Sequence, residues 1–171
     1  MGRVEIVSID NPIEAEMLLA ICRGSFRRYY PEFDEWYSSK VLPGIGFSRR
    51  VLKAISGGRI SGICIVKDDG LEKKICSLRV DVNHRRQGVG TALVAASIEV
   101  LDSRNPLITV PQEVMPALSP LLGKFGFKVA AEYRNLYRNG ASEFFYNGSL
   151  EFSADIDEAR KDNLLSKIAV L

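Results

Sequence analysis

The residues whose types and spacing could do chemistry most clearly lie at 85–91, Arg-Arg-Gln-Gly-Val-Gly-Thr, called the diphosphate loop below. A strand-like run precedes them and apolar residues at helical spacing follow, so the segment is predicted to open a helix. The first N–H groups of a helix have no partner within it, and the helix dipole favours negative charge there. Gly88 and Gly90 permit close approach to the backbone, and Arg85 and Arg86 add positive charge. The segment is therefore a candidate diphosphate site.

Two other phosphate-binding loops do not fit these residues. A Walker loop requires Gly-Lys followed by Ser or Thr, and this triplet does not occur in the sequence. A dinucleotide-binding fingerprint requires a third glycine after Gly88 and Gly90, and Leu93 occupies its place. The glycine pair therefore indicates a diphosphate site only in combination with the neighbouring arginines and with the predicted strand and helix at either side.

The elements that must position the loop are predicted to be a β-meander in front of it and a helix behind it. β-Branched and apolar runs separated by glycine-containing turns predict antiparallel strands at 50–55, 60–66 and 74–82. A helix is predicted to run from the loop to about residue 102, before a strand at 107–110. A helix between two strands indicates a parallel pair.

Further elements are predicted on both sides of this unit. They are a strand at 4–9, a helix at 13–28 capped by Asp10 or Asn11, a helix at 116–125, a hairpin of 127–136 with 143–145 around Asn139-Gly140, and a terminal helix from 154. Residues 32–46 are predicted to be irregular with a short helix. The aromatic and acidic side chains at 29–37, Tyr29 and Tyr30 among them, could line a substrate mouth or pack on the core.

Two stretches, 76–94 and 118–128, resemble the GNAT N-acetyltransferase superfamily. Arg85, Gly88 and Gly90 match the superfamily's Arg/Gln-x-x-Gly-x-Gly/Ala motif, and the Lys-Phe-Gly-Phe sequence at 124–127 is similar to a second element. The resemblance implies an α/β (α+β) GNAT fold with a mixed, mostly antiparallel sheet of about six to seven strands, splayed between the fourth and fifth. Helices flank this sheet, and one more follows at the C-terminus. We expect a single domain over 1–171, with its core at 3–150 and an extension at 151–171.

The resemblance also implies acetyl-CoA as co-substrate and no metal. The donor is expected beside the strand at 78–80, with its diphosphate on the loop and an amine attacking the thioester directly from the opposite side. The residues expected to contact the donor are Leu78, Arg79, Val80, Arg85, Arg86, Gln87, Gly88, Val89, Gly90 and Thr91.

The general acid that many members of the superfamily carry is absent. It is a tyrosine four residues before the Gly-Phe pair, and Leu122, which has no proton to donate, stands at that position. Ser119 and Tyr133 are the candidate donors in its place. Glu72 and Glu113 are the candidate general bases, because they lie nearest to the places where relatives carry a carboxylate.

The expected function is transfer of an acetyl group to a primary amine of a small molecule or protein. Because Leu122 replaces the acid, the alternative is a catalytically weak acyl-CoA-binding regulatory module. A third reading is a toxin-like GNAT protein acting on aminoacyl-tRNA, which would need the arginines at 23–28 and 49–53 to form one basic face. The net charge of +2 argues against a nucleic-acid partner.

The composition of the chain limits which other partners and which cellular location we expect. The chain is 46% hydrophobic and 26% charged, as in ordinary globular proteins. No apolar run reaches the ~20 residues that span a bilayer, which predicts no membrane partner and a cytoplasmic location. Three widely spaced cysteines, Cys22, Cys64 and Cys76, argue against a structural zinc. The apolar stripe at 154–171 needs burial on its own chain or, alternatively, in a homodimer.

Overall fold

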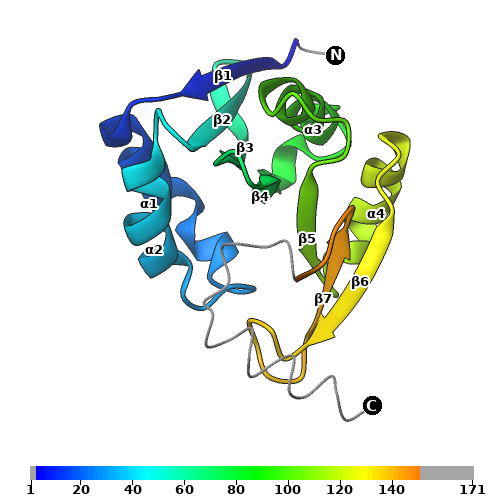
Figure 1. Ribbon diagram of the computed structural model, residues 1–171. Coiled ribbons are helices and arrows are strands. Elements are labelled where there is room, and N and C mark those ends of the chain that lie inside the picture. The colour runs from blue at the N-terminus through cyan, green and yellow to red at the C-terminus, as the bar shows by residue number, and fades with distance from the viewer. Residues whose placement is uncertain (1–2, 151–171) are drawn as a thin grey trace.

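One seven-stranded sheet organises residues 3–150, the part of the chain that the computed structural model describes. The strands are ordered β1-β2-β3-β4-β5-β7-β6 (Figure 1). Their bounds are β1 Glu5–Ile9, β2 Arg49–Ser56, β3 Arg59–Asp68, β4 Lys73–Val80, β5 Leu107–Pro111, β6 Val129–Arg134 and β7 Ser142–Tyr146. The main helices are α1 Pro12–Phe26, α2 Phe33–Trp36, α3 Val89–Val100 and α4 Met115–Lys124. None of these helices is long and apolar enough to cross a membrane.

The predicted meander is confirmed, because β2, β3 and β4 pair antiparallel in sequence order. The predicted parallel pair is confirmed as well, since β5 lies parallel to β4 after the crossover through α3. The closing hairpin forms, but β7 rather than β6 pairs with β5. Its connection is a longer loop, in which the Asn135 side chain accepts a hydrogen bond from the Gly140 N–H at 2.7 Å.

Two of the local predictions are sharpened. Asn11, not Asp10, caps α1, because its side chain accepts a hydrogen bond from the Ile13 N–H at 2.9 Å. The segment after α1 is more regular than expected: α2 continues into a π-helical turn, Tyr37–Val41, and a 3-10 turn, Leu42–Gly44. The predicted helix from residue 154 and its dimer contact lie outside the described residues.

The fourth and fifth strands of the sheet separate almost at once, as the fold prediction required. Only two residue pairs join β4 to β5, Lys74 with Leu107 and Ile75 with Ile108. Beyond Ile75, β4 continues to Val80 beside β3, whereas β5 continues beside β7. The sheet is therefore open between the C-terminal halves of β4 and β5.

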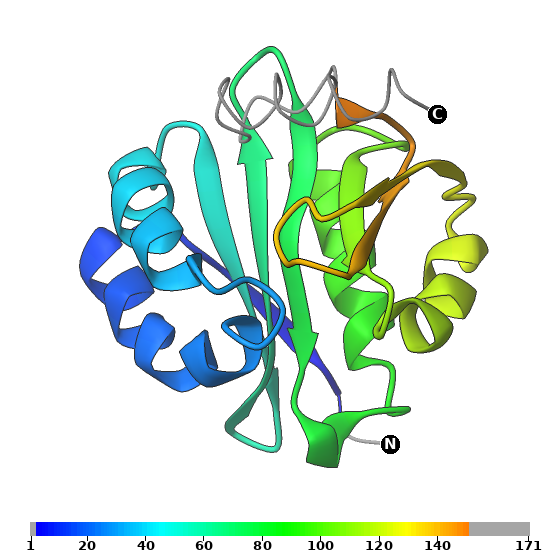
Figure 2. The ribbon, with the colours of Figure 1, turned by 90° about the horizontal axis from the view of Figure 1, so that it is seen from below.

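Helices cover both faces of the sheet, which buries its central strands on two sides. Figure 2 shows α1 and α2 on one side of the sheet and α3 and α4 on the other. One core joins α3 and α4 to residues such as Leu52 and Cys64, and a second joins α1 and α2 to Val51 and Ile65. Because neighbouring residues of a strand point to opposite faces, β3 is buried almost continuously from Ser61 to Lys67.

Gly62 of β3 lets α3 lie close against the sheet. A Cβ atom at this position would be 2.8 Å from the Arg79 carbonyl oxygen, 2.9 Å from Leu93 Cδ1 and 3.0 Å from Val89 Cγ1. The carbonyl belongs to the β4 backbone, which cannot move without disturbing the β3–β4 pairing. Gly62 therefore sets the distance between the sheet and the first turn of α3.

Gly62→Ala is expected to lower the free energy of unfolding by about 1–3 kcal/mol, the usual effect of overpacking a core. Urea unfolding followed by circular dichroism measures this change. Gly24→Ala is the matched control, because Gly24 lies in α1 with nothing near its Cβ position and should gain a little stability. Equal stability of Gly62→Ala and the wild type would contradict the close packing of α3.

Candidate active site

The diphosphate loop joins the end of β4 to α3 in the predicted manner. Gly88 is the N-cap residue of α3 and takes a left-handed conformation, with φ of 86°. No side chain caps the helix, so the first N–H groups of α3 are not satisfied by a capping side chain. A Cβ at Gly88 would have nothing within 4 Å, so the space over this backbone is open. The backbone and the dipole of α3 thus favour an anion here.

Side chains around the loop divide into those that order it and those that face solvent. Asp81 accepts a hydrogen bond from the Asn83 N–H at 2.9 Å, which together with a contact to His84 holds the pKa of the Asp81 carboxyl below its usual value. Gln87 donates to the Asn83 carbonyl oxygen at 2.8 Å. Arg85 and Arg86 are exposed, and no ion pair within residues 3–150 engages them. They remain available to a phosphate ligand.

The open edge of β4 carries a β-bulge where it leaves β5. In the pairing with β3, Ile75 lies opposite Val66 and Ser77 opposite Ile65, so Cys76 is the extra residue. A bulge leaves its extra residue out of the hydrogen-bond ladder and commonly occurs next to active sites. After the bulge, Leu78 and Val80 pack with the core of α3, whereas Cys76 packs with the core of α1 and α2.

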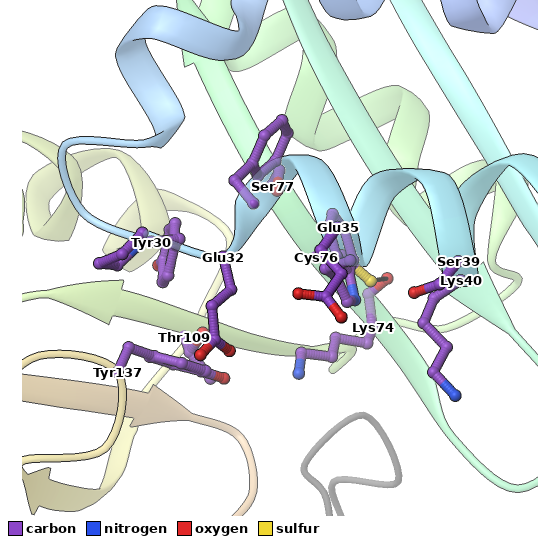
Figure 3. Close-up of a pocket in the computed structure, with 13 residues that line it drawn as sticks. Tyr30, Glu32, Glu35, Ser39, Lys40, Lys74, Cys76, Ser77, Thr109 and Tyr137 are labelled. Atoms are coloured by element: carbon purple, nitrogen blue, oxygen red, sulfur yellow. Dashed lines mark hydrogen bonds between the residues drawn. The ribbon is translucent and has the colours of Figure 1, made fainter.

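A pocket of about 410 Å³ lies on the α1 and α2 side of β4, at the point where β4 and β5 separate. This volume is in the range of small-molecule sites. The residues that line this β4 pocket come from the α1–α2 connection, α2, the π-helical turn, β4, β5 and the β6–β7 loop: Tyr30, Pro31, Glu32, Phe33, Glu35, Trp36, Ser39, Lys40, Lys74, Cys76, Ser77, Thr109 and Tyr137. Figure 3 shows Glu32, Lys74 and Tyr137 pointing toward one another from three of these elements.

A carboxylate lies behind the wall of the pocket. Glu143 of β7 is 4% exposed, and its Oε1 atom accepts a hydrogen bond from the Tyr30 hydroxyl at 2.8 Å. The Thr109 hydroxyl is a second hydrogen-bond partner. Burial raises the pKa of Glu143 to about 7, although hydrogen bonds from both hydroxyls and the charges of Lys74 and Arg138 oppose that rise. Burial also raises the pKa of Tyr30 well above 10, so its hydroxyl stays protonated.

Comparison with known families assigns the chain to a family. The sequence model of the family described as "Acetyltransferase (GNAT) domain" matches residues 46–145, more than half of the chain. The chain belongs to the GNAT acetyltransferase family. This confirms the resemblance seen in the loop, and the observed sheet confirms the GNAT fold that it implied. No curated protein matches the chain significantly in sequence.

Solved structures of GNAT enzymes share the fold at low sequence identity. The ribosomal-protein-S18-alanine N-acetyltransferase from Escherichia coli has a TM-score of 0.65 and 19% identity, over 84% of this chain and 92% of its own. Arabidopsis thaliana NAA60 with acetyl-CoA has a TM-score of 0.61 and 18% identity, over 84% and 97%. An aminoglycoside 6'-N-acetyltransferase with coenzyme A has a TM-score of 0.61 and 16% identity, over 83% and 94%.

Glu72, a candidate GNAT base from the sequence, lies away from the β4 pocket and has a structural partner. Its Oε2 atom is 2.8 Å from Lys67 Nζ, and both side chains are 4% exposed. Lys67 also contacts Asp69 at 2.8 Å across the β3–β4 turn. Glu72 therefore forms part of a buried ion pair at the base of this hairpin.

The three other catalytic candidates also lie outside the residues that line the pocket. Glu113 forms a two-pronged bond with Arg138, at 2.9 and 2.8 Å, which lowers the pKa of its carboxyl and makes it a weak base. The Tyr133 hydroxyl accepts a hydrogen bond from the Leu150 N–H at 3.1 Å, and its ring packs on Phe145. Ser119 lies half-buried on α4.

The structure also shows the surroundings of Leu122 and of the two arginine clusters. Leu122 is fully buried between α4 and the sheet, so it only packs. Arg23 and Arg27 both pair with Asp34. Arg49 is 5% exposed, and it donates a hydrogen bond to the Cys76 sulfur at 3.3 Å. The arginines at 23–28 and 49–53 thus do not combine into one free basic face.

Sequence reasoning included Tyr30 only among the aromatic residues that could line a substrate mouth, and it missed Glu143, Lys74 and Thr109. One signal was present in β7, where Glu143 is on the same strand face as Phe145 and precedes two aromatic residues. A charged residue at a buried strand position requires partners, and it is a candidate for function.

Proposed function

We propose that this protein transfers an acetyl group from acetyl-CoA to a primary amine of a small molecule or a protein. The observation that carries the proposal is the arrangement around β4. The diphosphate loop and α3 lie on one side of this strand, and the β4 pocket lies on the other. Only two residue pairs join β4 to β5, which leaves the C-terminal half of β4 without a strand partner on that edge among the described residues. A donor and an acceptor could therefore approach the same strand from opposite faces.

The donor would lie along the open edge of β4. Its diphosphate would bind the N–H groups at the start of α3 with Arg85 and Arg86, and Thr91 would add a hydroxyl. Its pantetheine arm would follow the strand at Leu78–Val80, whose edge toward β5 has no strand partner among the described residues. A backbone N–H near the bulge at Cys76 would polarise the thioester carbonyl.

The acceptor would enter the β4 pocket. Tyr30, Trp36 and Tyr137 provide aromatic walls, and the carboxylates of Glu32 and Glu35 line the pocket together with the ammonium groups of Lys40 and Lys74. Aromatic rings and carboxylates together suit a cationic amine. Held beside the thioester, the amine would attack the carbonyl carbon directly, and most of the rate would come from positioning and proton removal. Structural neighbours include enzymes for a protein amine and for an aminoglycoside, so both acceptor classes belong in the test.

Thiol release from acetyl-CoA across a panel of amines tests the proposal. The panel contains mono- and polycationic amines, peptides with a free N-terminus, and acidic amines as a contrast. We expect amine-dependent release, fastest with the cations. Arg86→Glu should lower kcat/KM for acetyl-CoA at least ~10-fold, because it replaces attraction to phosphate by repulsion. Arg134→Glu, an exposed position on β6, is the matched control and should leave it unchanged.

A second candidate function is an acyl-CoA-binding regulatory module with little or no catalysis. It is favoured by Leu122, whose buried side chain provides no acid where many relatives have one. Tight binding of acetyl-CoA in calorimetry, weakened by Arg86→Glu, with no thiol release on any amine would support this function over the first. No binding of acetyl-CoA would contradict both.

A further inference from the structure

Glu143 is a buried carboxylate at the edge of the candidate site. It lies opposite Pro111, the last residue of β5, at the end of the strand that borders the gap. Its hydrogen-bond partners are the neutral hydroxyls of Tyr30 and Thr109, and both of these residues also line the β4 pocket. The carboxylate is thus sealed from solvent but lies one hydrogen bond behind the pocket surface.

A comparison with Glu72 separates this arrangement from a structural ion pair. Glu72 is also buried, but it contacts the ammonium group of Lys67 directly at 2.8 Å. For Glu143, the cations act from further away. A carboxylate that only held β7 in place would be stabilised by a direct cation, as Glu72 is, because an ionised group in a low dielectric is costly. Among residues 3–150, Glu143 has no such direct cation, and with a pKa of about 7 its carboxyl can be charged or neutral near neutral pH.

Four segments among the described residues contribute groups that influence the charge of Glu143. The α1–α2 connection supplies Tyr30, β4 supplies Lys74 and β5 supplies Thr109. The β6–β7 loop supplies Arg138, and Tyr137 interacts with Tyr30. The two cations favour the carboxylate, whereas burial favours the neutral acid, and burial has the larger effect.

We propose that Tyr30 and Glu143 form a proton relay that removes a proton from the acceptor amine. Tyr30 is the catalytic residue, because its hydroxyl touches the amine. Glu143 is the positioning residue, because it receives the proton through Tyr30 and orients the hydroxyl. This inference rests on the proposed acetyl transfer and assigns its base, which neither Glu72 nor Glu113 is placed to be.

In this relay one proton moves from the acceptor to Tyr30 and another moves from Tyr30 to Glu143. The ammonium form of the acceptor donates a proton to the Tyr30 oxygen while the Tyr30 O–H proton passes to Glu143 Oε1. The products are a neutral amine, an intact Tyr30 hydroxyl and a protonated Glu143. The amine nitrogen then bonds to the carbonyl carbon, the carbon–sulfur bond breaks, and the CoA thiolate leaves. The amide nitrogen loses its second proton to that thiolate or to water, and Glu143 later returns its proton to solvent.

The relay works only when Glu143 is ionised, which fixes the direction of the pH effect. Because the pKa of Glu143 is about 7, kcat should fall about tenfold for each pH unit below that value. Glu143→Gln keeps the shape of the side chain but cannot accept the proton. It should lower kcat ~100-fold at pH 8 and abolish the inflection near neutral pH.

The experiment measures kcat against pH with saturating amine and acetyl-CoA for four variants and the wild type. Tyr30→Phe should lower kcat by a similar factor, and the double variant should be no slower than either single variant, because both remove one relay. KM for acetyl-CoA should not change. Glu132→Gln, exposed on the neighbouring strand β6, is the matched control and should keep the wild-type profile.

Difference infrared spectroscopy gives a readout that needs no turnover. The wild type should show a carboxylic-acid carbonyl band that titrates near pH 7, and Glu143→Gln should lack it. Two results would overturn the relay and leave the proposed function intact. The first is that the wild type acetylates an amine and Glu143→Gln shows the same fall of kcat at acidic pH. The second is that the wild type lacks the carbonyl band. Failure of the wild type to acetylate any amine would instead overturn the proposed function, and the relay with it.

Discussion

Replacing Gly88 by aspartate is expected to raise the dissociation constant for acetyl-CoA at least ~100-fold, or about 2.8 kcal/mol. Gly88 has a φ of 86° at the start of α3, where a side chain is strained. An aspartate there also places negative charge beside the N–H groups that would bind the diphosphate, and it can cap them itself. Isothermal titration calorimetry with acetyl-CoA measures the loss directly.

Gly88→Ala separates the two causes. Its Cβ would meet nothing within 4 Å, so alanine adds backbone strain without charge or a clash. We expect a smaller loss of affinity for alanine than for aspartate, together with a lower melting temperature in both variants. Equal affinity of the aspartate variant and the wild type would show that the diphosphate binds elsewhere.

Replacing Glu72 by alanine is expected to lower the free energy of unfolding by about 3–5 kcal/mol, because it breaks a buried ion pair. The change removes one of the carboxylates that contact the Lys67 ammonium, which is 4% exposed and also lies 2.8 Å from Asp69. The double variant Lys67→Met/Glu72→Met should recover most of the loss, since it removes both charges and keeps the volume. Denaturant unfolding measures the stability of all three proteins.

The same variants decide between the two roles considered for Glu72. If its role is structural, the folded fraction of Glu72→Ala should retain the wild-type kcat at 15 °C. Glu16→Ala, on the exposed side of α1, should change neither stability nor kcat. A large loss of kcat in a fully folded Glu72→Ala protein would restore Glu72 as a catalytic base.

The scaffold could be predicted from sequence because its signals are local. The meander shows β-branched runs between glycine turns, and α3 shows a helical stripe behind Gly88. The diphosphate loop is a contiguous motif, so its geometry at the start of α3 followed from the residues themselves. The place of β7 beside β5 did not follow, because local signals do not tell which strand of the hairpin pairs with the edge of β5.

The polar cluster at the pocket could not be predicted because its members are distant in sequence. Tyr30 and Glu143 are 113 residues apart and meet only after β7 has inserted beside β5. The ion pair of Glu72 could not be predicted for a related reason. Its partner Lys67 lies across a short hairpin turn, and a sequence alone does not tell whether such a pair is buried.

The two ladder positions between β4 and β5 divide the sheet into two lobes, β1–β4 and β5–β7–β6, that share very little backbone bonding. The spacing of the two lobes therefore depends on side-chain packing, for example around Gly90, where an added Cβ would lie 3.0 Å from Leu121 Cδ2 and 3.5 Å from Val80 Cγ2. A single substitution in that packing would change the spacing of the lobes without breaking a strand. If the donor binds along β4 as proposed, the hydrophobic core would thus set the size of acyl chain that the protein accepts.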